Sequence, residues 1–405
     1  MKSKYNLIIF YLVAAGDGIS GGTRIHIECT KKWQDNNIFE SITVLASDDG
    51  YSTCLKYGVY GSNLQLISTI FTKKINFWID YITRIFVGIY VSISYKLDTS
   101  QSYILYAASD FWADFFPALI IHLRYLDNTR LISPIYLFAP KIFHGYDGRL
   151  KFSLKLIVYN LMQKVMCFFA KRYSNAIFVT YTPDIERLWI RGFDSSRQPQ
   201  YVIVGGIEMG PTVSYSAHSV DSSKYEYDAV FVGRYHPQKG IYQLMDIWKI
   251  VCETKKDAKL AVLGNGDKKF DTYINDFITK NNLSKNIFLL GFMDGKSKYE
   301  LFSKTKIYLN TNLYDAGGMA TMEAMSCGLP VISFDFPNSK SMIEKGSLWA
   351  DYLDVNDFAN KALELLNNAD RRLLLGLEAR KFIGKYDWSL TASRISKYFK
   401  YAFDF

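Results

Sequence analysis

The segment between residues 307 and 334 constrains the fold of this chain more than any other. An apolar run at 307–311 is followed by the letters DAGGMATMEAM at 315–325, and a second apolar run comes at 330–334. The pattern predicts a strand, a glycine turn, a helix and a second strand, in that order. Such a unit builds a parallel sheet, in which ligands bind beyond the carboxyl ends of the strands.

The glycine turn in this segment predicts an anion-binding site. A Gly-Gly pair lets the backbone turn tightly before a helix, so that backbone N–H groups and the helix N-terminus point at a ligand such as a phosphate. Asp315 and Glu323 lie eight positions apart, where their carboxylates can accept hydrogen bonds from hydroxyl groups. A phosphate seat next to hydroxyl-binding acids is the arrangement that a nucleotide-sugar requires.

The same alternation of strands and helices runs through the rest of the chain. In the first half, strands are expected at 6–13, 42–46, 103–107, 130–138, 176–180 and 200–204, and helices at 24–33 and 111–125. In the second half, strands are expected at 228–233, 258–264, 307–311 and 330–334, and helices at 240–254, 319–327 and 358–367. We therefore expect an α/β protein with two Rossmann-like, doubly wound domains.

The length of 405 residues allows two domains with separate cores. The boundary is expected within 211–223, which is rich in Ser and Val and poor in strand or helix signals. This interpretation gives a first domain at 1–210 and a second at 211–385. The last segment, 386–405, is expected to form a helix that packs back on the first domain.

Charge and cysteine content narrow the partners and the compartment. Residues 1–205 carry 22 basic and 15 acidic side chains, an excess of seven, whereas the second half has an excess of only two. No nucleic-acid motif accompanies the basic half, so we favour an anionic membrane surface or a lipid-phosphate acceptor over nucleic acid; ordinary solubilising charge is the alternative. Five scattered cysteines without a C-x-x-C pair argue against disulfides and zinc, and for the cytoplasm.

Two long apolar segments bear on membrane binding. The segment 75–97 contains Asp80 and Arg84, and a charge in the middle of a membrane-spanning helix is costly. We interpret it as a core or membrane-facing amphipathic helix. In 150–170 an apolar face is flanked by lysines, which fits either a helix lying on anionic lipid or a core-packing helix.

A second motif, GRYHPQKG at 233–240, follows an expected strand and opens a helix. Arg234 and Lys239 bring a planar guanidinium and a compact ammonium to the two ends of one turn. Both can converge on a diphosphate leaving group. A solvated basic turn is the alternative. We favour the diphosphate interpretation, because the Asp315–Glu323 segment, which also suits a nucleotide-sugar, belongs to the same domain.

With these two motifs in place, the second half resembles the nucleotide-sugar domain of retaining GT-B glycosyltransferases of the group 1 (family 4) type. The resemblance covers 231–240, 262–266, 287–292 and 307–332, in the usual order. It implies two domains that face a cleft, with an acceptor-binding first domain and a nucleotide-sugar-binding second domain. The family's Glu-x7-Glu motif falls on Asp315 and Glu323, and Asp in place of the first Glu puts the donor sugar in doubt.

The resemblance also implies roles for individual residues. Arg234 and Lys239 hold the diphosphate, Glu323 takes the ribose hydroxyls, and Asp315 faces the donor sugar. The other donor-binding residues implied are Gly21, Gly22, Gly233, Gly264, Gly266, Phe292, Gly317, Gly318 and Met319. On the acceptor side we expect Ser109, Asp110 and His144, although Ser109 or Asp110 can instead cap the helix that follows.

The implied activity is transfer of a sugar from a nucleotide-diphosphate sugar to a glycan or lipid-linked acceptor, with retention of configuration and without a metal or other cofactor. A cytoplasmic protein, peripheral on the inner face of the membrane and engaged in cell-surface polysaccharide or glycoconjugate synthesis, is the corresponding expectation. Two alternatives remain open at this point. One is a nucleotide-sugar 2-epimerase or hydrolase, and the other is a non-catalytic glycosyltransferase-like binding subunit.

Overall fold

The computed structural model describes residues 5–13, 20–60, 64–68, 76–143, 153–208, 225–314 and 318–404. The chain divides into two compact units. Unit 1 contains the described residues up to Ile142, those of Phe152–Gly205, and the C-terminal segment from Trp388. Unit 2 contains Gly206–Asp387. The division predicted from the sequence has its boundaries at 210/211 and 385/386.

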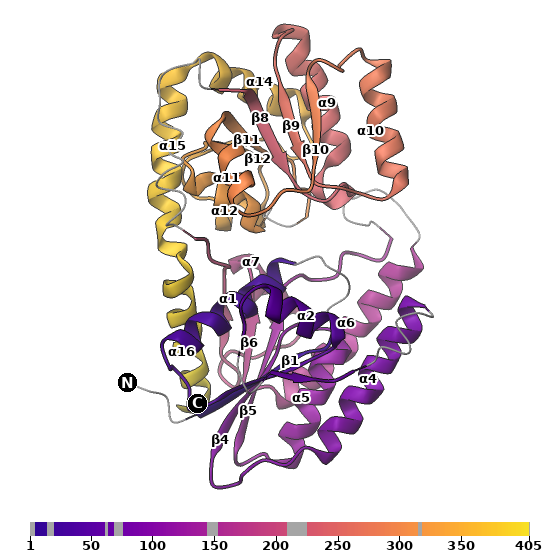
Figure 1. The fold of residues 1–405 in the computed structure, drawn as a ribbon, viewed down its shortest axis with the longest axis vertical. Coiled ribbons are helices and arrows are strands. Elements are labelled where there is room, and N and C mark those ends of the chain that lie inside the picture. The colour runs from indigo at the N-terminus through magenta and orange to yellow at the C-terminus, as the bar shows by residue number, and fades with distance from the viewer. Residues whose placement is uncertain are drawn as a thin grey trace. The chain divides into compact units, whose positions relative to one another are not determined.

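Unit 1 is a parallel α/β sheet with helices on both faces, as the sequence predicted (Figure 1). Its strands are β1 (Tyr5–Tyr11), β2 (Ile42–Ala46), β3 (Leu64–Leu66), β4 (Ser102–Ala107), β5 (Thr129–Ile135), β6 (Ala176–Val179) and β7 (Gln200–Val202), in the order β3-β2-β1-β4-β5-β6-β7. Its helices are α1 (Gly21–Asp35), α2 (Asp48–Lys56), α4 (Phe77–Ser94), α5 (Trp112–Arg124), α6 (Leu154–Tyr173), α7 (Thr182–Ile190) and α16 (Trp388–Asp404).

Successive side chains of β1 point to opposite faces of this sheet. Ile8 and Phe10 enter a core with α5 and α6, and α4 packs against α5 in the same layer. On the other face, Tyr11 contacts His26 of α1. The C-terminal helix α16 also belongs to unit 1, because Phe399 stacks on Phe178 of β6 and the Trp33 indole N–H donates to the Ala392 carbonyl at 2.8 Å.

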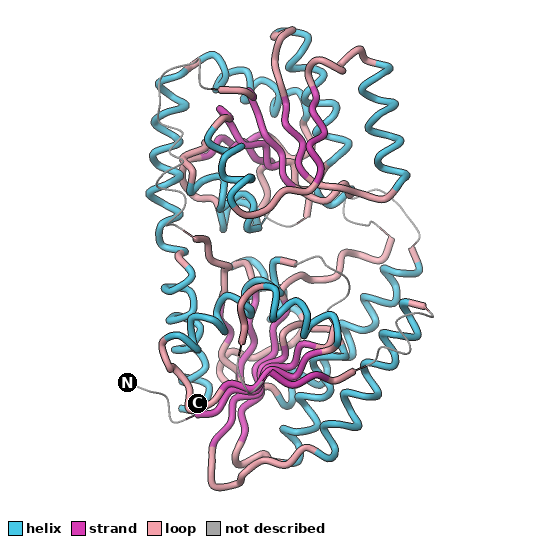
Figure 2. The backbone as a smooth tube through the Cα atoms, viewed as in Figure 1, coloured by secondary structure: helices cyan, strands magenta, loops and turns pink. Residues whose placement is uncertain are grey.

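Unit 2 repeats this architecture with a second parallel sheet, and helices enclose the strands of both units (Figure 2). Its strands are β8 (Tyr227–Val232), β9 (Leu260–Leu263), β10 (Ile287–Gly291), β11 (Thr305–Asn310), β12 (Val331–Phe334) and β13 (Ser347–Ala350), in the order β10-β9-β8-β11-β12-β13. Its helical segments are η2 (Pro237–Lys239), α9 (Ile241–Thr254), α10 (Lys268–Lys280), α11 (Lys296–Ser303), α12 (Gly318–Ser326), α13 (Pro337–Met342), α14 (Val355–Asn367), α15 (Ala369–Ile383) and η3 (Gly384–Tyr386).

The strand order reverses once in each sheet, and that point positions the candidate site. The chain runs from β8 outward to β10 and then returns to β11, which pairs with β8 on its other side. A crevice forms outside the carboxyl ends of two such strands, because their connections leave in opposite directions. In unit 2 the loops that follow β8 and β11 flank this point, and they contain both motifs found in the sequence. In unit 1 the loops after β1 and β4 take the equivalent place.

Asp48 and Asp49 follow β2 closely and form the first turn of α2, with Ser47 as its N-cap. Carboxylates are favourable there because they lie at the positive end of the helix dipole. Among the described residues, no helix is long and apolar enough to cross a membrane.

Candidate functional site

In unit 2 the loops at the carboxyl ends of three neighbouring strands are joined by backbone hydrogen bonds. Gly233 N–H donates to the Leu263 carbonyl at 2.9 Å, and Tyr235 N–H donates to that of Asn265 at 2.8 Å. Gly264 N–H donates to the Gly291 carbonyl, also at 2.8 Å. The loops after β8, β9 and β10 are therefore held together at the carboxyl-terminal edge of the sheet, that is, along the carboxyl ends of its strands. The turn that carries Arg234 and Lys239 is part of this edge.

Gly264 is required where two of these loops meet. Its φ is +137°, and a Cβ atom at this position would lie 2.0 Å from the carbonyl oxygen of Gly233. The predicted donor-binding residue Gly264 thus has a structural task, which is to let its backbone approach that of Gly233 closely. Gly266 packs in the same way against Tyr235.

We expect Gly264→Ala to destabilise the protein by at least about 2 kcal/mol, because the new methyl group adds a clash to an unfavourable backbone conformation. Urea unfolding of purified protein measures this loss. Gly291→Ala is a matched control, since Gly291 also has positive φ, at +70°, but a Cβ there meets no atom within 4 Å. Equal losses for both variants would show that backbone conformation, and not the contact with Gly233, is what requires glycine.

The two cations of the turn differ in their surroundings. Arg234 is exposed, whereas Lys239 is half-buried at the end of η2. The backbone beside Lys239 is fixed to the end of β11, because the Thr311 hydroxyl donates to the Lys239 carbonyl at 2.9 Å and Leu313 N–H donates to that of Gln238 at 3.0 Å. Gly240, with φ of +65°, lies so close to Thr311 that a Cβ atom would be 1.9 Å from its carbonyl oxygen. The basic turn is thereby fixed to the segment that leads into α12.

Glu323, on α12, lies in a buried ion pair that the sequence did not reveal. Its Oε2 is 2.8 Å from the Nζ of Lys298 on α11, and both side chains are almost fully buried. The same Nζ lies 2.9 Å from Oδ1 of Asp294. Lys298 therefore fixes the Glu323 carboxylate in place. The Asp294-x3-Lys298 spacing predicts a surface i,i+4 pair, so only the fold reveals that Lys298 is turned inward.

A buried network of polar side chains lies at the ends of β11 and β12, next to this edge. Asn310, the last residue of β11, donates to the Ser333 hydroxyl at 3.1 Å and accepts a hydrogen bond from Asn312. Ser333 also shares a hydrogen bond of 2.8 Å with Ser339. All four side chains are buried. Such a network orders the strand end from which the glycine turn departs.

The remaining donor-side predictions fall partly outside the described residues. Asp315 and Gly317 lie there, as does the acceptor-side residue His144. Gly318 is described; it has φ of +59° and begins α12, and Met319 lies in the first turn, half-buried. Phe292 directly follows β10 and is 70% exposed. The predicted roles of these residues remain predictions.

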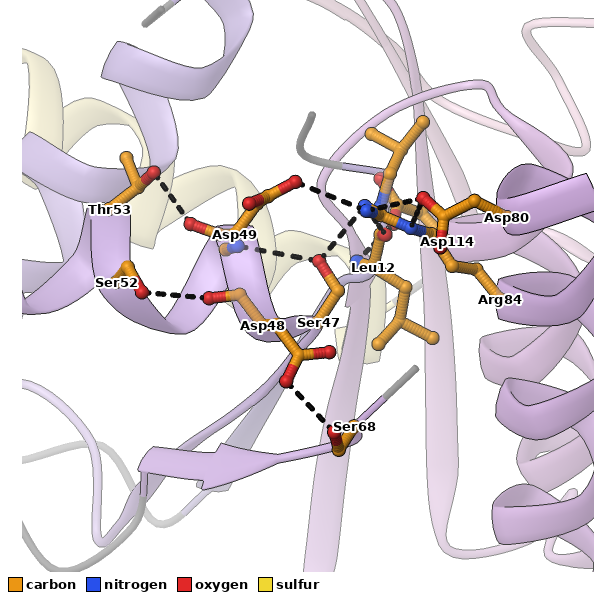
Figure 3. Close-up of polar contacts among 12 residues, drawn as sticks. Leu12, Ser47, Asp48, Asp49, Ser52, Thr53, Ser68, Asp80, Arg84 and Asp114 are labelled. Atoms are coloured by element: carbon orange, nitrogen blue, oxygen red, sulfur yellow. Dashed lines mark hydrogen bonds and ion pairs between the residues drawn. The ribbon is translucent and has the colours of Figure 1, made fainter. Parts of the chain in front are cut away.

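In unit 1 the corresponding edge is a buried network centred on Arg84 (Figure 3). Its guanidinium lies 2.7 Å from Asp80 and 3.2 Å from Asp49, and it donates to the Leu12 carbonyl at 3.1 Å. Asp114 of α5 accepts from the backbone N–H groups of Leu12 at 2.6 Å and Val13 at 3.0 Å. The two charges that interrupt the apolar segment 75–97 therefore point inward, where they hold the end of β1.

Ser109 and Asp110 are also engaged inside unit 1. Ser109 donates to Asp114 at 2.5 Å, and Asp110 accepts from the Gln163 side chain at 2.7 Å. Neither is the N-cap residue of α5, which is Phe111, although the Ser109 hydroxyl accepts from the Phe111 N–H at 3.3 Å. Burial raises the pKa of Asp110 to about 6. Their role toward an acceptor stays a prediction.

Gly21 and Gly22 form the start of α1, whose N-cap residue Ser20 accepts from Thr23 N–H at 3.1 Å. A Cβ atom on Gly22 would lie 2.7 Å from the ring of Tyr136, so this glycine lets the helix start pack on the end of β5. Gly21 meets no such neighbour. Packing against Tyr136 therefore explains why residue 22 is a glycine. The structure gives no such reason for a glycine at position 21.

Burial raises the pKa of Asp114 to about 7, against the opposing effect of its hydrogen bonds from Ser109, Leu12 and Val13. The folded state thus favours the protonated form, whereas the unfolded carboxyl titrates near 3.8. The contribution of Asp114 to the free energy of unfolding is therefore greatest below about pH 4. It falls as the pH rises through about 7, and the total loss is at most about 4 kcal/mol.

We expect Asp114→Asn to flatten this pH dependence, since an amide accepts from Leu12 and Val13 and donates to Ser109 at every pH. Urea unfolding across this pH range tests the prediction, with Asp98→Asn in an exposed loop as the control. Parallel curves for wild type and Asp114→Asn would contradict it. Some slope remains in the variant, because the pKa of Asp110 is raised in the same direction.

Within the described parts of the chain, no group of three or more His, Cys, Asp or Glu side chains is arranged to hold a metal ion. Arg234 and Lys239 bring positive charge to this edge, and the backbone N–H groups at the start of α12 add partial positive charge. The edge is thus suited to an anion with attached hydroxyl groups.

Comparison with known proteins agrees with this geometry. Residues 217–382 match the family model of glycosyl transferases group 1. An uncharacterised glycosyltransferase of Methanocaldococcus jannaschii, MJ1178, is 30% identical over 173 residues, which are 42% of this chain and 47% of that protein. The phosphatidyl-myo-inositol mannosyltransferase of Mycobacterium leprae is 25% identical over 228 residues, 54% of this chain and 57% of that protein. The chain thus spans about half the length of these relatives.

The structural likeness extends over nearly the whole chain. HepE from Anabaena, solved in complex with UDP and glucose, superposes with a TM-score of 0.73 at 13% identity, over 98% of this chain and 100% of that one. Identity this low shows the fold alone. Together, the two parallel-sheet units and these matches show that the chain has the GT-B fold. Residues 217–382, within the second unit, are similar to the group 1 glycosyl transferases.

Proposed function

We propose that this protein is a retaining glycosyltransferase that moves a sugar from a nucleotide-diphosphate sugar to a glycan or lipid-linked acceptor. The observation that carries the proposal is the arrangement of loops in unit 2 at the point where the strand order reverses, between β8 and β11. There the turn with Arg234 and Lys239 is bonded to the segment leading into α12, and α12 holds Glu323. Cations, a helix N-terminus and a fixed carboxylate thus belong to one edge of one sheet.

The proposed mechanism relies on stabilising the leaving group. As the bond between sugar and diphosphate breaks, negative charge grows on the diphosphate oxygens. In this proposal Arg234, Lys239 and the N–H groups at the start of α12 face that charge before the bond breaks, so little reorganisation is needed at the moment of reaction. The mechanism needs no protein nucleophile, since the acceptor hydroxyl attacks the anomeric carbon from the same face that the diphosphate leaves, which retains the configuration, and passes its proton to a diphosphate oxygen. It needs no metal ion, since the side-chain cations and N–H groups stabilise the leaving diphosphate.

Glu323 positions the donor in this proposal. Its carboxylate accepts hydrogen bonds from the ribose hydroxyls, and the ion pair with Lys298 keeps it oriented. Asp315 faces the transferred sugar. Unit 1 supplies the acceptor side, with Ser109, Asp110 and His144 as the residues predicted there. Gly21 and Gly22 are assigned to the donor phosphates.

The names of two similar proteins support the proposed classes of donor and acceptor. HepE is named in complex with UDP and glucose, and the Mycobacterium leprae relative is named for a phosphatidyl-inositol acceptor. We therefore propose polysaccharide or glycolipid synthesis as the setting and the cytoplasm as the compartment. Cys29, Cys54, Cys167, Cys252 and Cys327 are buried free thiols, which agrees with a reducing environment.

A panel of nucleotide-diphosphate sugars tests the proposal in two steps. A donor that binds the folded protein should raise the melting temperature, and transfer from that donor to a glycan or lipid acceptor should then give a product with the donor's anomeric configuration by NMR. Inverted configuration would overturn the retaining assignment. Free nucleotide with an epimerised or hydrolysed sugar, in the absence of acceptor, would overturn transfer itself.

A further inference from the structure

The outer surface of helix α4 is apolar along its whole length. Its only two charges, Asp80 and Arg84, are buried against the end of β1. The opposite face exposes large apolar side chains at helical spacing: Trp78, Ile79, Ile82, Phe86, Tyr90 and Ile93. Phe86 is 66% exposed and Tyr90 is 74% exposed. A surface helix normally shows the reverse polarity, because its charged face meets water.

A basic helix lies in the same layer. Helix α5 packs against both α4 and α6, and Figure 1 shows the three helices along one side of the unit 1 sheet. Leu154, Leu161 and Phe168 form an exposed stripe on α6. Four cations accompany this stripe, all exposed, and the helix contains no Asp or Glu: Lys155, Lys164, Lys171 and Arg172. Among the described residues, none of the four forms an ion pair.

We propose that the outer faces of α4 and α6 dock unit 1 onto an anionic lipid bilayer. The apolar side chains of α4 enter the boundary between headgroups and acyl chains, and the α6 cations contact anionic headgroups. Helix α4, about 27 Å long, lies flat in this arrangement. Trp78 and Tyr90 suit the interface, because each combines an apolar ring with a polar group.

Charge favours a membrane over a second copy of the chain. In a symmetric dimer formed through this layer, the α6 helices of both copies would bring four cations each to one interface. Like charges at an interface are costly, whereas an anionic bilayer neutralises them. The basic excess of the first half of the chain acts in the same direction.

Vesicle flotation with the purified full chain tests the proposal, without donor or acceptor. Wild type should float with phosphatidylcholine vesicles that contain phosphatidylglycerol, and binding should fall with added salt. The triple variant Phe86→Ser/Tyr90→Ser/Ile93→Ser should reduce the bound fraction about tenfold or more. The pair Lys164→Glu/Lys171→Glu should remove the preference for anionic vesicles. Leu374→Ser/Leu377→Ser, two exposed leucines of α15 in unit 2, is the control and should bind as wild type.

Three outcomes would overturn the proposal. One is equal binding by the triple variant and the control pair, and another is binding that ignores lipid charge and salt. The third is a wild-type dimer in light scattering that the triple variant converts to a monomer, with no vesicle binding by either. Because the substituted side chains are exposed, the variants should keep the wild-type melting temperature, and this is checked first.

Discussion

Replacing Lys298 by methionine should lower the free energy of unfolding by about 3–5 kcal/mol. The Glu323 carboxylate then loses the cation that faces it at 2.8 Å in the interior of unit 2. Removing one partner of a buried ion pair is strongly destabilising, because the remaining charge stays buried without the attraction that offset part of its desolvation. Urea unfolding of the two purified proteins measures the difference.

Partner variants distinguish this from a general loss of packing. Glu323→Gln should cost less than Lys298→Met, because Lys298 keeps its contact with Asp294. Lys298→Met/Glu323→Leu should recover much of the lost stability, since apolar residues can replace a buried pair without net cost. Lys296→Met, on the exposed side of the same helix, should change stability by no more than about 0.5 kcal/mol. A Lys298→Met protein as stable as wild type would contradict the buried pair.

The same variants separate stability from function. If Glu323 binds the donor, Lys298→Met/Glu323→Leu should fold and still fail to bind a nucleotide-sugar that stabilises wild type. Isothermal titration at a temperature well below the unfolding transition measures this. Donor binding by the double variant with wild-type affinity would remove Glu323, and with it Lys298, from the proposed donor site.

Arg234→Ala and Lys239→Ala should each lower turnover of the donor by about 10-fold to 1000-fold. Each variant loses one charged contact to the leaving diphosphate, and such contacts contribute about 1–4 kcal/mol in the transition state. Turnover is measured as release of free nucleotide in the presence of donor and acceptor. The effect should be on kcat more than on KM, because the charge on the leaving group grows as the bond breaks.

Both variants should fold normally. Arg234 is exposed, and the hydrogen bond from Thr311 reaches the backbone of Lys239 and not its side chain. Lys280→Ala, at the far end of α10, is the matched control and should retain full activity. Unchanged turnover in both test variants would remove the diphosphate assignment, whatever the identity of the sugar.

The order of elements could be predicted from the sequence because it follows local periodicity. Buried parallel strands are short apolar runs, and glycine or proline marks their ends. This was enough to find β8, β9, β11 and β12 and the two motifs between them. The local pattern does not decide the structure at Asp48 and Asp49, because a strand-end turn and the first turn of a helix favour the same polar residues.

Part of the candidate site could be proposed from the sequence. Arg234, Lys239 and Glu323 were proposed because their residue types suit a phosphate and a ribose and because they lie near glycine turns. Lys298 was missed because an i,i+4 pair with Asp294 looks the same in sequence whether the helix face is exposed or buried. The contact between Gly264 and Gly233 joins two separate loops, and no local pattern predicts such a contact.

The sequence by itself determined the class of fold, the order of strands and helices, and the positions of the basic turn and the glycine turn, since each is encoded within a few neighbouring residues. Only the tertiary structure decided which way charged side chains face. It turned Lys298 and Arg84 inward and left the apolar side of α4 in water. The physical reason is that burial depends on partners from distant segments, whose carboxylates and carbonyls become available only when the sheets form.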